Sequence, residues 1–66
     1  MFNATFQVLR PGLAIVELTD AAGAWAGSYR IDAKPRRKLY DIGYDRAATE
    51  AALKGGRLQR YSCAKV

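Results

Sequence analysis

The segment Asp20-Ala21-Ala22-Gly23 is the sequence feature that most limits how this chain can fold. It suits a tight turn, because Asp favours the first position and Gly adopts the left-handed conformation that follows. Apolar and β-branched residues precede the turn over 13–18, and an alternating pattern follows it over 25–32. The segment 12–32 therefore predicts a β-hairpin. On one side of its second strand we expect Trp25, Gly27, Tyr29 and Ile31.

A third strand is predicted ahead of this hairpin. Apolar side chains alternate with polar ones from Phe2 to Val8, which is the pattern of a half-buried strand. Arg10-Pro11-Gly12-Leu13 then has the composition of a turn, since Pro fixes φ at the second position and Gly accepts positive φ at the third. Three antiparallel strands in succession are the expected result.

The second half of the chain predicts a loop, a short strand and a helix. We expect residues 33–38 to form a loop around Pro35 and residues 39–44 to form a short strand in which alternate side chains share one side. Asp45 is the expected N-cap of a helix over 46–54, which Gly55-Gly56 ends. The segment 57–66 is either a final strand or a frayed tail, because neither of its alternating faces is uniformly apolar.

These elements predict a single α+β domain, 1–66. It consists of a small antiparallel β-meander of three to five strands, with one short helix near residues 46–54 packed on the sheet. A chain of 66 residues has room for one small core and no deep pocket. The side chains expected to fill that core are Phe2, Phe6, Val8, Ile15, Val16, Leu18, Trp25, Tyr29, Ile31, Ile42 and Leu53.

Composition indicates a non-catalytic protein. There is no histidine, so the commonest general base and zinc ligand is missing, and no glycine-rich phosphate loop occurs. Asp41 and Asp45 form the one close carboxylate pair. We expect Asp41 to be an exposed strand residue and Asp45 to be a helix cap, so the pair needs no catalytic role. Cys63 is the single cysteine and is expected to be packed or idle. We therefore expect no enzymatic activity, no metal and no cofactor.

The single cysteine also excludes an intramolecular disulfide, which favours a reducing compartment for so small a domain. No apolar run has the length of a membrane span, and the first residues lack the pattern of a signal peptide. The expected location is the cytoplasm, either of the cell that makes the protein or of a host cell that receives it from a phage. No membrane partner is expected.

Positive charge is concentrated in the second half of the chain. The net charge is +5, with −1 over residues 1–33 and +6 over residues 34–66. Tyrosines accompany both basic segments, and cations with aromatic rings suit phosphates and bases, or an acidic protein surface. The structural alternative is that the basic segment is only a solvated loop and that the tyrosines lie at the edge of the core. The candidate binding residues are Lys34, Arg36, Arg37, Lys38, Tyr40, Tyr44, Arg57, Arg60 and Tyr61.

The meander over 2–32, followed by the helical segment DRAATEAALKGG, resembles in size and build the small anti-CRISPR inhibitors encoded by phages and mobile elements. The resemblance rests on the compact α+β architecture and the composition, without a sequence motif. It implies an inhibitor that blocks a nucleic-acid or nuclease-recruitment surface of a CRISPR effector complex. A basic inhibitor would dock on an acidic protein patch or on bound RNA.

Three functions therefore stay open. The first is an inhibitor that binds a host protein or nucleoprotein complex through a basic surface. The second is direct binding of nucleic acid through Lys34, Arg36, Arg37, Lys38, Arg57 and Arg60. The third is a structural or assembly protein that completes its small core by forming oligomers.

Overall fold

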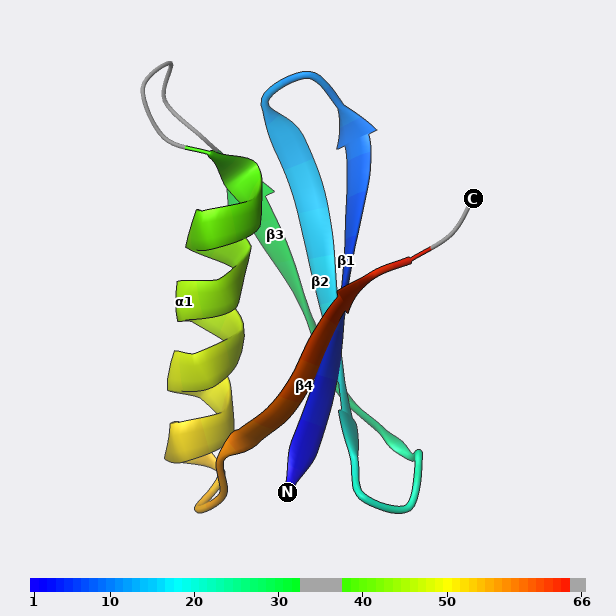
Figure 1. Ribbon diagram of the computed structural model, residues 1–66, viewed down its shortest axis with the longest axis vertical. Coiled ribbons are helices and arrows are strands. Elements are labelled where there is room, and N and C mark those ends of the chain that lie inside the picture. Colours follow the sequence, from blue (N-terminus) through cyan, green and yellow to red (C-terminus); the bar gives the residue numbers. More distant parts are fainter. Residues whose placement is uncertain (33–37, 65–66) are drawn as a thin grey trace.

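The structure, a computed structural model, describes residues 1–32 and 38–64. It contains a four-stranded sheet and one helix, which packs on a single face of that sheet (Figure 1). The elements in chain order are β1 (Phe2–Arg10), β2 (Leu13–Asp20), β3 (Trp25–Asp32), α1 (Leu39–Leu53) and β4 (Leu58–Cys63). The predicted α+β fold, a small sheet covered by one helix, is confirmed.

The predicted meander forms the first three strands. β1 pairs antiparallel with β2, and β2 pairs antiparallel with β3. Gly12 has a φ of 82° in the first turn, as its predicted position requires. In the second turn the N–H of Gly23 donates to the Asp20 carbonyl oxygen at 3.0 Å. The Asp20 carboxylate also accepts from the N–H groups of Ala22 and Ala24, both at 2.9 Å, so this one side chain closes the turn.

The fourth strand lies on the other side of β1 and runs parallel to it. Residues 58–63 pair with residues 2–6, which gives the sheet the order β3-β2-β1-β4. Parallel neighbours need a crossover connection, and α1 provides it by carrying the chain from one edge of the sheet to the other. The predicted last strand is therefore present over Leu58–Cys63, and the sheet is mixed.

The helix begins seven residues earlier than predicted, at Leu39 instead of residue 46. The predicted strand over 39–44 is wrong, because these residues form the first turns of α1. Asp45 is inside the helix and not at its N-cap; Lys38 occupies that position without a side-chain capping hydrogen bond. The helix ends where expected, with Gly55 at a φ of 81° and the Gly56 N–H donating to the Ala51 carbonyl at 3.0 Å.

Close packing of α1 on the sheet explains why residues 39–44 are helical although their side chains alternate as in a strand. The buried residues of α1 are Gly43, Ala47 and Ala51, which recur every fourth position and so share one face. A Cβ at Gly43 would lie 3.0 Å from Phe6 Cδ1 and 3.1 Å from Val16 Cγ2. The helix axis thus comes close to the sheet, and this contact outweighs the β-propensity of the tyrosines.

The β-bulges in β3 and β4 change the side on which neighbouring residues lie. Leu18 is opposite Gly27 and Thr19 is opposite Trp25, so Ala26 is the extra residue in β3. Ala26 packs against the core, whereas Trp25 lies on the opposite side of the sheet and is 67% exposed. The prediction that Trp25 shares a side with Gly27 is therefore wrong.

The second bulge is in β4. Phe2 is opposite Leu58, and Asn3 is opposite Arg60, which leaves Gln59 as the extra residue. Leu58 and Tyr61 consequently both pack against the core, although they are three positions apart. This bulge is why neither alternating face of 57–66 is uniformly apolar.

The core lies between the sheet and α1. Phe6, Val16, Leu18 and Ile31 are buried as predicted, and Phe2, Tyr29 and Ile42 pack against them. Four predicted core residues are wrong: Val8, Trp25 and Leu53 are exposed, and Ile15 lies opposite Gln7 and Arg30 on the face of the sheet away from α1. Val8 lies past Phe6, the last residue of β1 that pairs with β4. Over 1–32 and 38–64, no helix has both the length and the apolar character needed to cross a membrane.

Candidate binding surface

Three tyrosines meet on the α1 side of the sheet, beside β4. Tyr40 and Tyr44 are one turn apart on α1, and Tyr61 comes from β4. The ring centroid of Tyr61 lies 4.7 Å from that of Tyr40 and 5.5 Å from that of Tyr44. Phe6 contacts Tyr40 and Tyr61 edge to face, at 5.3 and 6.2 Å. We call Tyr40, Tyr44 and Tyr61 the tyrosine cluster.

Tyr61 fixes this cluster to the fold. Its hydroxyl donates a 2.7 Å hydrogen bond to the carbonyl oxygen of Tyr40. Burial raises the pKa of the Tyr61 hydroxyl well above its ordinary value, and the nearby Tyr40, Cys63 and Asp41 raise it further. The group therefore stays a protonated donor at neutral pH.

The other two rings remain accessible. Tyr40 is 41% exposed and Tyr44 is 49% exposed, although both contact Tyr61. Tyr rings held by their neighbours offer apolar faces and a hydroxyl to a partner, with little conformational entropy left to lose. The arrangement suits binding of a surface.

The predicted basic residues occupy different parts of the molecule. Lys38 is exposed next to Tyr40, at the start of α1. Arg57 is exposed beyond the other end of α1, a helix that is about 22 Å long, whereas Arg60 is exposed in β4 directly before Tyr61. Arg60 lies opposite Asn3, on the side of the sheet away from Tyr61. Lys34, Arg36 and Arg37 lie outside the described residues.

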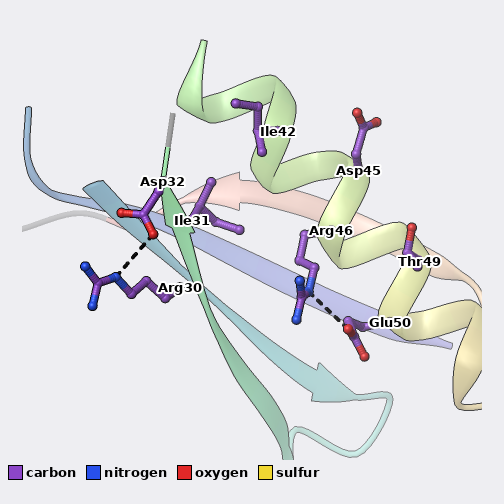
Figure 2. A pocket seen from close by; sticks show the side chains of 8 residues that line it. All are labelled: Arg30, Ile31, Asp32, Ile42, Asp45, Arg46, Thr49 and Glu50. Atoms are coloured by element: carbon purple, nitrogen blue, oxygen red, sulfur yellow. Dashed lines mark ion pairs between the residues drawn. The ribbon is translucent and has the colours of Figure 1, made fainter. Parts of the chain in front are cut away.

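A shallow depression between β3 and α1 was not predicted (Figure 2). Its cations are matched by carboxylates: Arg46 pairs with Glu50 at 3.0 Å, and Arg30 pairs with Asp32 at 3.3 Å. The Arg46 guanidinium also lies over the ring of Tyr29, 5.1 Å from its centroid. This local neutralisation makes the depression a weak candidate for a charged ligand. Its lining consists of Arg30, Ile31 and Asp32 from β3 and Ile42, Asp45, Arg46, Thr49 and Glu50 from α1.

The remaining candidate groups form no assembled centre. Asp41 and Asp45 lie one turn apart on α1, and Cys63 is exposed near the end of β4. Among the residues that the structure describes, no three His, Cys, Asp or Glu side chains come close enough to hold a metal ion.

Comparison with known proteins gives no relative. No protein-family model, curated protein or solved structure matches the chain. The function has to be argued from the surface itself, and the tyrosine cluster is the most organised part of that surface.

Proposed function

We propose that this protein is a non-catalytic cytoplasmic binding protein that inhibits a host protein or nucleoprotein complex. The observation that carries the proposal is the tyrosine cluster, in which Tyr61 holds two half-exposed rings in place. Tyr is among the residues that contribute most to protein–protein affinity. Rings that are already ordered lose less entropy on binding than free side chains do.

The charge of the chain favours an acidic target. Lys38 is exposed two positions before Tyr40, and Lys34, Arg36 and Arg37 precede it in the sequence. Positive charge beside aromatic rings increases the rate of encounter with an acidic surface. A CRISPR effector complex is the specific target that the resemblance in size and build suggests, and a nucleoprotein of that kind carries both acidic protein surface and RNA.

Site-specific photo-crosslinking in bacteria tests the proposal. A photoreactive phenylalanine analogue replaces Tyr44 in one variant and Leu53 in the other. Leu53 is 75% exposed on the same helix, nine residues further along, and so points to the opposite side of α1. We expect a discrete adduct from position 44 and none from position 53. Equal adducts from both positions, or none from position 44, would contradict the proposal.

A quantitative test follows with the purified partner. Tyr44→Ser is expected to weaken binding at least about tenfold, because a buried aromatic anchor contributes about 2 kcal/mol or more. Leu53→Ser is expected to bind like the unchanged protein. The partner's own activity should fall as the protein is added, and unchanged partner activity at saturation would exclude inhibition.

A further inference from the structure

The face of the sheet opposite α1 is covered by no element within residues 1–32 and 38–64 (Figure 1). One row of this face crosses all four strands. Arg60 of β4 lies opposite Asn3 of β1, Asn3 lies opposite Thr19 of β2, and Thr19 lies opposite Trp25 of β3. We call Arg60, Asn3, Thr19 and Trp25 the open-face row.

Trp25 is the unusual member of this row. It is the single tryptophan of the chain, and it is 67% exposed. The largest fully buried side chains of the described residues, Leu18 and Val16, are both smaller than this exposed ring. The bulge at Ala26 turns it away from the core, and the turn just before it is closed by the Asp20 carboxylate. An aromatic ring held on an open sheet face is the arrangement on which unpaired bases stack.

The opposite end of the row is cationic. Arg60 lies three strand spacings from Trp25, which is about 14 Å. Lys54 and Arg57 precede Arg60 between α1 and β4, and all three are exposed. In the described part of the chain none of them forms an ion pair, and residues 54–66 contain no Asp or Glu. These charges are free to neutralise phosphates.

Polar side chains occupy the row between the ring and the cations. The Thr19 hydroxyl donates to the Asn3 carbonyl at 3.4 Å, which leaves the Asn3 side-chain amide to bond a base edge. The next row places Ser62 and Ser28 on either side of Thr5 and Glu17. Two acidic residues lie near the open-face row: Asp20 directly follows Thr19, and Glu17 belongs to the next row of this face. Both repel phosphates.

We infer that the open-face row binds single-stranded nucleic acid, with a base stacked on Trp25 and phosphates beside Arg60. This surface lies on the opposite side of the sheet from the tyrosine cluster, so it is independent of the proposed inhibitory function. It places the nucleic-acid contacts on Trp25, Asn3 and Arg60. Of these three, only Arg60 was among the residues that the sequence predicted for nucleic-acid binding, together with Arg57 and the basic segment 34–38.

Tryptophan fluorescence gives a direct test, because Trp25 is the only source of the signal. An oligothymidylate or oligouridylate of about 12 nucleotides is titrated into the full-length protein at about 50 mM salt. We expect quenching of the Trp25 emission and an affinity that falls as salt rises to about 200 mM. The oligonucleotide that binds with the higher affinity identifies DNA or RNA as the preferred ligand. No quenching with either oligonucleotide at low salt would overturn the inference.

Substitutions identify the contacts by fluorescence anisotropy with labelled oligonucleotides. Trp25→Ala is expected to weaken binding about tenfold, since stacking on one ring contributes about 1–3 kcal/mol. Trp25→Phe should recover part of the loss, and Leu53→Gln should change nothing. Equal binding by Trp25→Ala and Leu53→Gln would contradict stacking on the open face.

Substitutions that remove one charge distinguish binding at this site from a general dependence of the affinity on net charge. Arg60→Gln is expected to reduce the slope of log affinity against log salt by about 0.7, the value for one phosphate contact on a single strand. Arg30→Gln removes the same charge from a residue that is paired with Asp32, two rows away, and should change the slope less. Glu17→Gln should tighten binding. Equal effects of Arg60→Gln and Arg30→Gln would overturn the assignment.

Discussion

The hydroxyl of Tyr61 donates to the carbonyl oxygen of Tyr40 at 2.7 Å, joining the last strand to the first turn of the helix. These residues are 21 positions apart in the chain. The same hydroxyl lies 2.5 Å from where a Cβ at Gly43 would be, so it occupies the space that this glycine leaves. One side chain therefore both orders the tyrosine cluster and sets how closely α1 approaches the edge of the sheet.

Tyr61→Phe should lower the free energy of unfolding by about 1 kcal/mol. The substitution removes one hydrogen bond and keeps the ring contacts with Phe6, Tyr40 and Tyr44. Urea unfolding followed by circular dichroism measures the change. Tyr44→Phe is the matched control, because within the described residues its hydroxyl makes no hydrogen bond. Equal losses in the two variants would show that the Tyr61 bond contributes nothing.

Stability should fall in alkaline solution because of Tyr61. Burial raises the pKa of its hydroxyl in the folded protein, whereas in the unfolded chain the pKa is about 10. Below about pH 10 both states keep the proton and the contribution is constant; above it the unfolded chain releases the proton first, and unfolding becomes easier. Urea unfolding between about pH 9 and pH 11 should show a steeper loss than in Tyr61→Phe. Parallel pH profiles would contradict this assignment.

Gly43→Ala should destabilise the protein, although Ala is the better helix former by about 1 kcal/mol. The added methyl group would meet Tyr61, Phe6 and Val16 at 2.5 to 3.1 Å, and overpacking of this kind costs about 1–3 kcal/mol. Thermal unfolding measures the result. Combining it with Tyr61→Phe removes the shortest of these contacts, so the two losses should be less than additive. A stabilised Gly43→Ala variant would show that the helix can move away without cost.

Asp20→Ala should cost about 1–2 kcal/mol of stability. Its carboxylate accepts from the N–H groups of both Ala22 and Ala24, and Ala offers no acceptor. Asp20→Asn keeps one acceptor oxygen and should lose less than half as much. The comparison is made by urea unfolding, and equal losses would mean that the charge, not the hydrogen bonding, holds the turn.

Ala51→Leu and Leu53→Gln should have opposite outcomes on the same helix. Ala51 is fully buried, so a larger side chain there overpacks the core and costs about 1–3 kcal/mol. Leu53 is 75% exposed, so a polar replacement should change stability by less than about 0.5 kcal/mol. Thermal unfolding of both variants checks the assignment, and a strongly destabilised Leu53→Gln would show that this residue is covered.

The meander was predictable because each of its turns contains the residues that the turn geometry requires. Asp20 and Gly12 determine their turns locally, without help from distant parts of the chain. The start of the helix was missed because Tyr40, Ile42 and Tyr44 alternate like a strand. The contrary signal was the recurrence of Gly43, Ala47 and Ala51 at helical spacing, which becomes decisive only when a sheet lies against it.

The tyrosine cluster and the open-face row differ in how much of each could be predicted from the sequence. Tyr40, Tyr44 and Tyr61 were candidates, but their meeting depends on β4 returning parallel to β1, a long-range pairing. Trp25 was assigned to the core because regular alternation places it there. A single extra residue, Ala26, reverses its side. The local signal of this bulge is Gly27, a glycine inside a strand that adopts a φ of 153° next to Ala26.

The position of β1 between β2 and β4 has a consequence for folding during translation. Of the four strands, β1 leaves the ribosome before the others, and it is a central strand; one of its two neighbours, β4, is made nearly sixty residues later. Until α1 and β4 emerge, a nascent chain can pair β1, β2 and β3 but leaves Phe6 and Val16 without the helix that buries them. Synthesis that stalls before α1 would therefore release a sheet with an uncovered apolar side and with β1 unpaired on one edge, which is the form most prone to join another such chain.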